Sequence, residues 1–346
     1  MKPPKFLTSF PRSLTEVSHF KAAELKNFLL YYSLPCLFGI LPMDQFNHFS
    51  LLVYAIYIFL QQNITAKDIL QCRKFLLEFV INVPVMYGER YMTSNVHLLL
   101  HLADKVEDLG PLWCSSCFYF EDFNGQLRRL FHGTQHIETQ IAFAAGVHQS
   151  LPKIAQSLKV GSCEQDLFEK MMTKNIQRTS ENITEAVSVV GAFSCRPCTE
   201  EELGAIQNSV GNVKSVTFFK RLYLRQQIIH SVNYHASSRR NNSVIKLESG
   251  SFGQVQNFVK VIPVCACIRC NCRPVFMAFM REMDRADDIL MEQQRCSDTN
   301  HMVPVRSPNG PLQAVLVQDI SDVCICVNIE DNLSFLSAVP NRIEKE

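Results

Sequence analysis

Residues 242–264 read NSVIKLESGSFGQVQNFVKVIPV, and this stretch decides the fold class of the second half of the chain. Two runs rich in valine, isoleucine and phenylalanine flank turn-forming residues around Gly250, which is the pattern of two strands joined by a short turn. Phe252, Val255 and Phe258 are available for packing in a core. The stretch therefore predicts a β-hairpin.

Similar short runs lie on both sides of this hairpin. They are rich in β-branched and aromatic residues and are separated by clusters of Gly, Asn, Asp and Pro. The runs occupy residues 215–224, 273–283, 312–320 and 323–329. Together with the hairpin they predict a small antiparallel β domain, barrel-like in form, over residues 214–346.

The first half of the chain has a different hydrophobic period. Its apolar residues recur at helical spacing, as in FKAAELKNFLLYY (20–32) and DILQCRKFLLEFV (68–80), with prolines as punctuation. We therefore expect a helical region over residues 1–176. Residues 177–213 mix polar, small and turn-forming residues with little periodicity, which predicts a linker. The predicted fold class is α+β, with a helical half followed by a β domain.

Length and composition limit the classes of function. A chain of 346 residues that is 47% hydrophobic can bury substantial cores in two or three domains. The 34 Lys and Arg residues nearly balance the 33 Asp and Glu residues, so any binding of nucleic acid has to depend on local patches. No small-molecule substrate is evident from the sequence.

The start of the chain and its cysteines indicate a reducing compartment. The first residues, MKPPKFLTSFPRSL, lack the apolar core of a signal peptide, so the 14 cysteines are expected to be free thiols. The sequons at Asn63, Asn182 and Asn241 are then chance matches. The apolar runs 28–41 and 49–60 are shorter than the roughly 20 residues that span a bilayer, so buried helices are expected instead of membrane spans.

Residues 118–133, FYFEDFNGQLRRLFHG, raise the question of what the Glu121 carboxylate does. A helix over 118–132 would separate an apolar face from a charged face. The apolar face holds Phe123, Leu127 and Leu130, and the charged face holds Glu121, Gly125, Arg128 and His132. A helical glycine costs about 1 kcal/mol, which the approach of a metal, a backbone or a phosphate would explain. The alternative is an ordinary amphipathic helix with an exposed Glu–Arg pair.

The run NVHLLLHLADKV places His97, His101 and Asp104 on one side of a predicted helix. Two imidazoles one turn apart can share a zinc ion, which needs four ligands. Cys114 and Cys117 follow at a spacing that is chemically compatible with the other half of such a site. Partly buried histidines bonded to their neighbours are the alternative.

Other cysteines and basic residues form smaller clusters. The run CACIRCNCR has four thiols within eight residues, but alternation along a strand favours small apolar residues over a metal site. Cys195 and Cys198 form half of a site without an evident partner. The basic residues just before the hairpin either contact phosphates or are solvated charges. These clusters comprise Cys265, Cys267, Cys270 and Cys272, and Lys220, Arg221, Arg225, Arg239 and Arg240.

Several blocks of the chain resemble, in order, animal transposase-domain proteins related to the CACTA (EnSpm) group of DDE transposases. The most specific block covers residues 95–135, where the histidine pair, Gly-Pro-Leu-Trp and the Phe-Glu-x-x-Asn-Gly run occur at the family's spacing. The other blocks are RSLTEVSHFKAAELKNFLLYYSLPCL (12–37), HFSLLVYAIYIFL (48–60), MTSNVHLLLHL (92–102) and VPNRIE (339–344).

The resemblance implies an RNase H-like core in which two aspartates and a final glutamate hold two Mg²⁺ or Mn²⁺ ions. Glu121 would match the final glutamate on the last helix of that core. His97 and His101 would match half of a zinc site in a helical insertion, and Arg128 and Arg129 would face the DNA backbone. DNA is the implied partner, and the implied location is the nucleus.

This chain departs from the family pattern because both aspartates and the C-x2-C pair are expected before residue 1. Asp44, Asp68, Asp104 and Asp108 lie in or beside predicted helices, and none follows a strand-like run. One carboxylate cannot hold two magnesium ions. The chain is therefore expected to be the C-terminal part of a transposase, inactive unless a second transposase polypeptide supplies the aspartates. A nuclear, non-enzymatic protein whose β domain binds protein or DNA, and a remnant without a role, are the alternatives.

Overall fold

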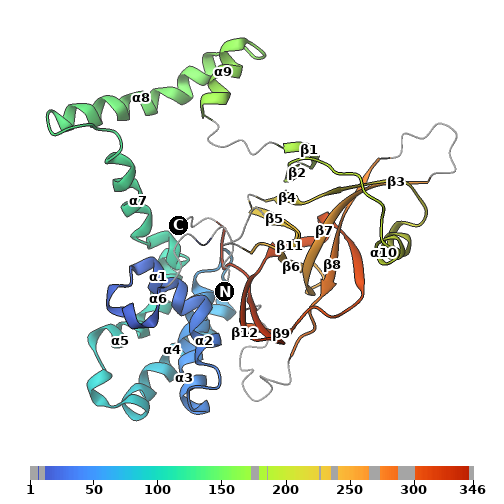
Figure 1. Ribbon diagram of the computed structural model, residues 1–346. Helices are drawn as coiled ribbons and strands as arrows, with labels where there is room; N and C mark the ends of the chain where they lie inside the picture. Colours follow the sequence, from blue (N-terminus) through green and yellow to red (C-terminus); the bar gives the residue numbers. More distant parts are fainter. Residues whose placement is uncertain are drawn as a thin grey trace. The chain divides into compact units, whose positions relative to one another are not determined.

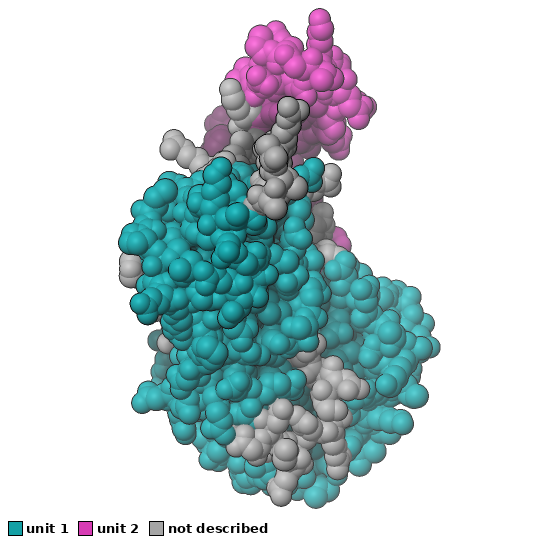
Figure 2. Space-filling model, turned by 90° about the vertical axis from the view of Figure 1, so that its right-hand side faces the viewer, with its two compact units in different colours: residues 1–114, 179–346 teal, residues 115–178 magenta. Residues whose placement is uncertain are grey.

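The computed structural model describes residues 7, 12–172, 179–184, 186–225, 227–234, 241–264, 273–286 and 301–342. The chain divides into two compact units (Figure 2). Unit 1 consists of Met1–Cys114 together with Thr179–Glu346, and unit 2 of Ser115–Arg178. The fold class is α+β, as predicted, since helices precede antiparallel sheets along the chain (Figure 1).

The N-terminal part of unit 1 is helical, and its helix boundaries follow from local sequence signals. The longest helix, α4 (Ala66–Tyr87), begins with a capping box between Thr65 and Asp68 and ends at Gly88, whose φ of 103° favours glycine. The helix before it, α3 (Met43–Phe59), packs against α4. The remaining helices are α1 (Ala22–Asn27), α2 (Ser33–Leu37), α5 (Ser94–Leu98) and α6 (Leu102–Leu109), and the short turns are η1 (Leu14–His19), η2 (Phe28–Tyr32), η3 (Glu89–Tyr91), η4 (Leu99–His101) and η5 (Leu112–Ser115).

The two apolar runs expected to be buried helices do lie in the helical core. Leu30, Tyr31 and Leu34 of the first run and Val53 and Phe59 of the second are buried. None of the helices in the described residues has both the length and the apolar character that a membrane crossing would require.

The predicted hairpin at 242–264 is confirmed as β6 (Val244–Leu247) and β7 (Phe252–Pro263). β7 is the central strand of a six-stranded sheet: β8 (Val275–Glu282) pairs along one edge, and β6 and β3 (Val213–Phe219) share the other. β10 (Leu312–Leu316) and β11 (Ile320–Val323) complete it.

Two smaller antiparallel sheets accompany this central sheet. One has the order β1-β2-β4-β5 and the other the order β12-β13-β9. Over the described ranges the three sheets are open, and the strand order shows no closed barrel. Their strands are β1 (Thr179–Thr184), β2 (Val187–Val190), β4 (Arg221–Leu224), β5 (Gln227–His230), β9 (Val303–Arg306), β12 (Ile325–Glu330) and β13 (Leu333–Ser337).

The segment 177–213, expected as a linker, contains β1, β2 and the helix α10 (Glu200–Val210). α10 begins with a capping box between Thr199 and Glu202. Its buried residues Ala205 and Ile206 pack on the β-sheet residues Phe218 and Phe279. This segment is therefore part of the β core of unit 1.

The helical and β parts of unit 1 share one hydrophobic core. Leu30, Tyr57, Ile325 and Phe335 belong to the same buried cluster, although the first two lie near the start of the chain and the last two near its end. The Tyr57 hydroxyl donates a hydrogen bond to the carbonyl oxygen of Ala338 at 3.0 Å. The helices of unit 1 are therefore anchored to the sheet β12-β13-β9.

Unit 2 is built from α7 (Phe118–Leu127), α8 (Ile137–Ser157) and α9 (Cys163–Met172). No side chain that the structure describes in this unit is buried. Phe120 and Phe123 of α7 are 63% and 50% exposed, so neither aromatic ring is buried against the described residues. Unit 2 gains little stability from apolar burial.

Candidate functional site

Glu121 lies in the first turn of α7 and is exposed to solvent. Its backbone N–H continues the helix by donating to the carbonyl oxygen of Cys117 at 3.0 Å. The carboxylate makes no hydrogen bond or ion pair with any residue that the structure describes. A carboxylate near a helix N-terminus is favoured by the helix dipole, so this position alone also suits an ordinary surface helix.

Arg128 and Arg129 lie where α7 ends. The helix stops at Leu127, earlier than the expected 132, and residues 128–130 form a turn. Arg128 still shares the side of Glu121, two turns and about 10 Å further along the axis. His132 no longer belongs to this face, because it lies beyond the end of the helix, where its backbone N–H donates to the Gln140 side chain at 2.9 Å.

Gly125 lies between Glu121 and Arg128 on the same side of α7. A Cβ placed at this glycine would meet nothing within 4 Å. Neither a neighbouring backbone nor a positive φ therefore explains the glycine, and the space beside it is open. The face formed by Glu121, Gly125, Arg128 and Arg129 is called the α7 face below.

The two arginines of the α7 face differ from several other arginines in the described residues, which form ion pairs. Both are exposed, and neither has a carboxylate partner in the described residues. By contrast, Arg281 binds Glu201 at 2.7 Å and Arg225 binds Glu248 at 3.4 Å. Further ion pairs join Arg12 to Glu24, Arg73 to Asp104 and Glu107, Arg196 to Glu202, Lys260 to Glu181 and Arg342 to Asp322. The α7 face thus presents two cations whose donors are open to an external anion.

His97 and His101 are close, but they do not lie on one continuous helix. The 3-10 turn η4 separates α5 from α6 and changes the angular spacing, so the two imidazole rings meet edge to face with centroids 5.5 Å apart. Both side chains are exposed. His101 Nδ1 lies 3.9 Å from a carboxylate oxygen of Asp104.

Asp104, which lies beside the histidine pair, is also bound by Arg73. Its carboxylate accepts a hydrogen bond from Arg73, and this bond lowers the pKa of Asp104. Across the ranges that the structure covers, no three His, Cys, Asp or Glu side chains lie close enough together to share a metal ion. The histidine pair supplies two nitrogen ligands, which is half of a tetrahedral zinc site.

The other predicted residues have separate positions. Asp68 caps α4, and Asp44 lies in the first turn of α3. Cys114 and Cys117 are both exposed, as is Cys195, while Cys198 packs beside α10. The cysteines at 265–272 and the arginines at 239 and 240 lie outside the described residues.

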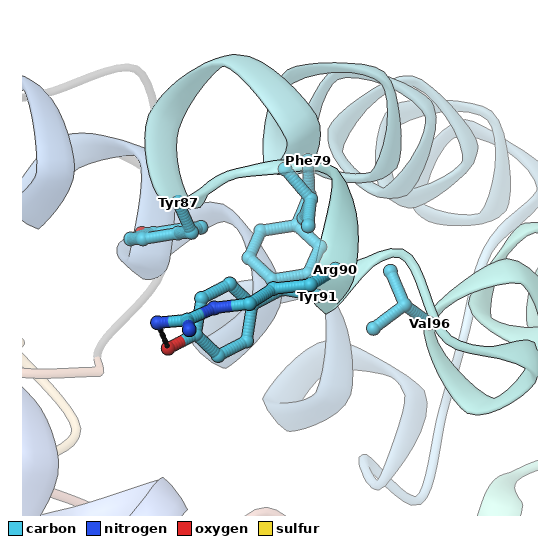
Figure 3. A pocket seen from close by; sticks show the side chains of 6 residues that line it. Phe79, Tyr87, Arg90, Tyr91 and Val96 are labelled. Atoms are coloured by element: carbon cyan, nitrogen blue, oxygen red, sulfur yellow. Dashed lines mark hydrogen bonds between the residues drawn. The ribbon is translucent and has the colours of Figure 1, made fainter.

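A cavity at the end of α4 was not predicted from the sequence (Figure 3). Arg90 and Tyr91 of η3 line it together with Tyr87. The three elements that line it are separated by turns, so no periodic pattern joins them. Gly88, which is followed by Glu89, Arg90 and Tyr91, was the one local signal, and it indicates only a helix end.

No family model, no curated protein and no solved structure matches this chain.

Proposed function

We propose that this chain is derived from a DDE-type DNA transposase and binds DNA phosphates through the α7 face. The observation that carries this proposal is the pair of exposed arginines, Arg128 and Arg129, which have no carboxylate partner among the described residues. Arginine binds phosphate through several donors in a fixed fork, and such contacts position a protein on DNA without reading its sequence. A nuclear location agrees with this role.

The proposal assigns DNA binding to this chain and not cleavage by the chain alone. Glu121 is taken as the final carboxylate of the family's triad, and a single carboxylate leaves too little charge and geometry for two Mg²⁺ or Mn²⁺ ions. A second transposase polypeptide with two aspartates would complete the site. His97 and His101 are proposed as half of a zinc site, since both imidazoles are exposed and adjacent.

We further infer that the helices of unit 1 correspond to the family's helical insertion and that α7 corresponds to the last helix of an RNase H-like core. The β strands are proposed to form a barrel-like module. The support for this module is one buried cluster that draws Val189, Leu222 and Ile229 from the four-stranded sheet and Phe258 and Ala278 from the six-stranded sheet. Two sheets that enclose one core approach the arrangement of a barrel.

The DNA contact is tested by a salt titration of duplex binding, followed by fluorescence anisotropy between about 50 and 200 mM salt. Each phosphate contact adds about 0.9 to the slope of log affinity against log salt, so Arg128→Gln with Arg129→Gln should reduce that slope by about 1.8. Glu121→Gln should strengthen binding, because it removes a negative charge from the same face.

The matched control removes two arginines that already have carboxylate partners. Arg225→Gln with Arg281→Gln lowers the formal charge of the chain by the same amount, but these side chains are paired with Glu248 and Glu201. The slope of this control should equal that of the unmodified chain. Absence of binding at about 50 mM salt, or equal slopes for both double variants, would contradict the proposal.

A further inference from the structure

The cavity at the end of α4 has a volume of about 540 Å³ and opens to solvent. This volume lies within the range of small-molecule sites, about 300–1,000 Å³. Three elements contribute to it: the last turns of α4, the turn η3 and the start of α5. The lining residues are Phe79, Val83, Tyr87, Arg90, Tyr91 and Val96.

The floor of the cavity belongs to the hydrophobic core of the helical region. Phe79 and Val83 are 7% and 3% exposed, and they pack with residues of α3 and α6. A ligand that covers this floor removes from water the small apolar area that these two side chains still expose, without any rearrangement of the core.

The ring of Tyr87 forms one wall of the cavity, and the buried His48 holds it by a hydrogen bond. His48, which is buried, stacks on Phe79 with ring centroids 4.6 Å apart. Its Nε2 lies 2.8 Å from the Phe79 carbonyl oxygen, so Nε2–H is the donor there. Its Nδ1 then accepts a hydrogen bond from the Tyr87 hydroxyl at 3.1 Å. The Tyr87 wall is therefore held in place before any ligand binds.

Arg90, which is exposed, supplies a cationic group to the lining of the cavity. Its Nη2 donates to the Tyr91 hydroxyl at 2.8 Å, and its guanidinium carbon lies 4.7 Å from the centroid of the Tyr91 ring (Figure 3). Arg90 has no carboxylate partner within the described part of the chain. Stacking on tyrosine orients the guanidinium and leaves further N–H donors for a ligand.

The charges near the cavity define where an anion can bind. Burial raises the pKa of Tyr87, and the nearby Asp44 carboxylate raises it further. The Tyr87 side of the cavity therefore disfavours an anion, and the Arg90 side favours one. An occupant that matches both features has a flat apolar body and one negative charge at the Arg90 end.

We propose that this cavity binds a small molecule composed of a flat apolar ring system and a single carboxylate. The ring system covers Phe79 and Val83 between the two tyrosines, and the carboxylate accepts hydrogen bonds from Arg90. Nucleotides also combine a flat ring with an anion, but the polar edges of a base find no donor or acceptor on the Phe79–Val83 floor. This site is independent of the DNA contact proposed for α7.

The proposal is tested by isothermal titration calorimetry of the full chain with 2-naphthoate. The neutral 2-naphthamide has the same ring system and should bind about tenfold more weakly, since it lacks the charge-assisted hydrogen bond. Arg90→Gln should remove this difference, whereas its neighbour Glu89→Gln, which does not line the cavity, should preserve it. Val96→Trp should fill the cavity and weaken both ligands.

Three results would overturn the proposal. The first is no saturable heat with 2-naphthoate at millimolar concentration. The second is equal affinity for the acid and the amide, or an unchanged ratio in Arg90→Gln, because either result removes Arg90 from recognition. The third is tighter binding of thymidine monophosphate than of 2-naphthoate, which would mean that the cavity selects a nucleotide. Because Arg90 is exposed, its replacement is not expected to prevent folding.

Discussion

At the scale of single residues, His301 is a histidine buried among aromatic side chains. It is 2% exposed and stacks on Tyr57 at a centroid distance of 3.8 Å, with Tyr54 and Tyr31 at its edges. Its Nδ1 lies 2.8 Å from the Ser337 hydroxyl oxygen. Burial lowers the pKa of His301 to about 3, because the charged form would lose its hydration.

This shift predicts how the stability of unit 1 depends on pH. The folded state keeps His301 neutral below its unfolded pKa of 6.5, so the unfolded state binds more protons between about pH 6.5 and 3. The free energy of unfolding should therefore fall as pH falls through this window, by up to roughly 1.4 kcal/mol per pH unit. In urea unfolding at pH 7, 6 and 5, the free energy of unfolding should fall less steeply with decreasing pH in His301→Phe than in the unmodified chain.

The control for this experiment is His148→Gln, at an exposed position of α8. It should leave the pH dependence of the unfolding midpoint unchanged. The same dependence in His301→Phe and in the unmodified chain would show that protonation of His301 does not govern acid stability.

At the scale of elements, Gly125 lowers the stability of α7, and replacing it tests whether a glycine is needed there for DNA to approach the helix. Replacing it by alanine should stabilise the helix by about 0.5–1 kcal/mol, since a Cβ there meets no neighbour. Amides of α7 should then exchange about threefold more slowly with deuterium. If a phosphate approaches this face, Gly125→Ala should also weaken DNA binding.

Gly146 provides the matched helical glycine on α8, where a Cβ also meets nothing within 4 Å. Gly146→Ala should slow exchange in α8 and leave DNA affinity unchanged. Faster exchange of the α7 amides in Gly125→Ala would contradict the predicted stabilisation of the helix. An equal loss of DNA affinity in Gly125→Ala and Gly146→Ala would contradict the assignment of the α7 face.

Elements with a strong period could be predicted from the sequence, and elements without one could not. The helices α3 and α4 and the hairpin β6–β7 are long enough for their apolar period to identify them. β9 was missed because Pro304 interrupts it, although an edge strand tolerates the missing N–H donor. α10 was missed because it is only 11 residues long and Gly204 weakens its apolar pattern, yet its capping box, Thr199 with Glu202, was readable.

The candidate site could be predicted only in part, for a related reason. Spacing placed Glu121 and Arg128 on one side of α7, which the helix preserves, but it did not reveal that the helix ends at Leu127. Spacing also could not show that η4 interrupts the helix of His97 and His101. Ion pairs between distant residues, such as Arg73 with Asp104, decide which charges remain open, and a single sequence does not contain them.

At the scale of the whole molecule, the two units differ in how they are stabilised. Unit 1 holds the buried clusters, including the shared core in which Tyr57 reaches Ala338. Unit 2 has no buried side chain among its described residues, so its helices should open locally at small cost. Segments of low local stability are suited to binding, since a partner can supply the surface that orders them.

Hydrogen–deuterium exchange of the full chain with and without duplex DNA tests the DNA-binding claim most directly, because it locates the contact. The claim predicts that DNA slows exchange at the C-terminal end of α7 and through residues 128–133, and that Arg128→Gln with Arg129→Gln abolishes this protection. Protection confined to the strands β3 to β8, or protection of α7 that persists in the double variant, would contradict it.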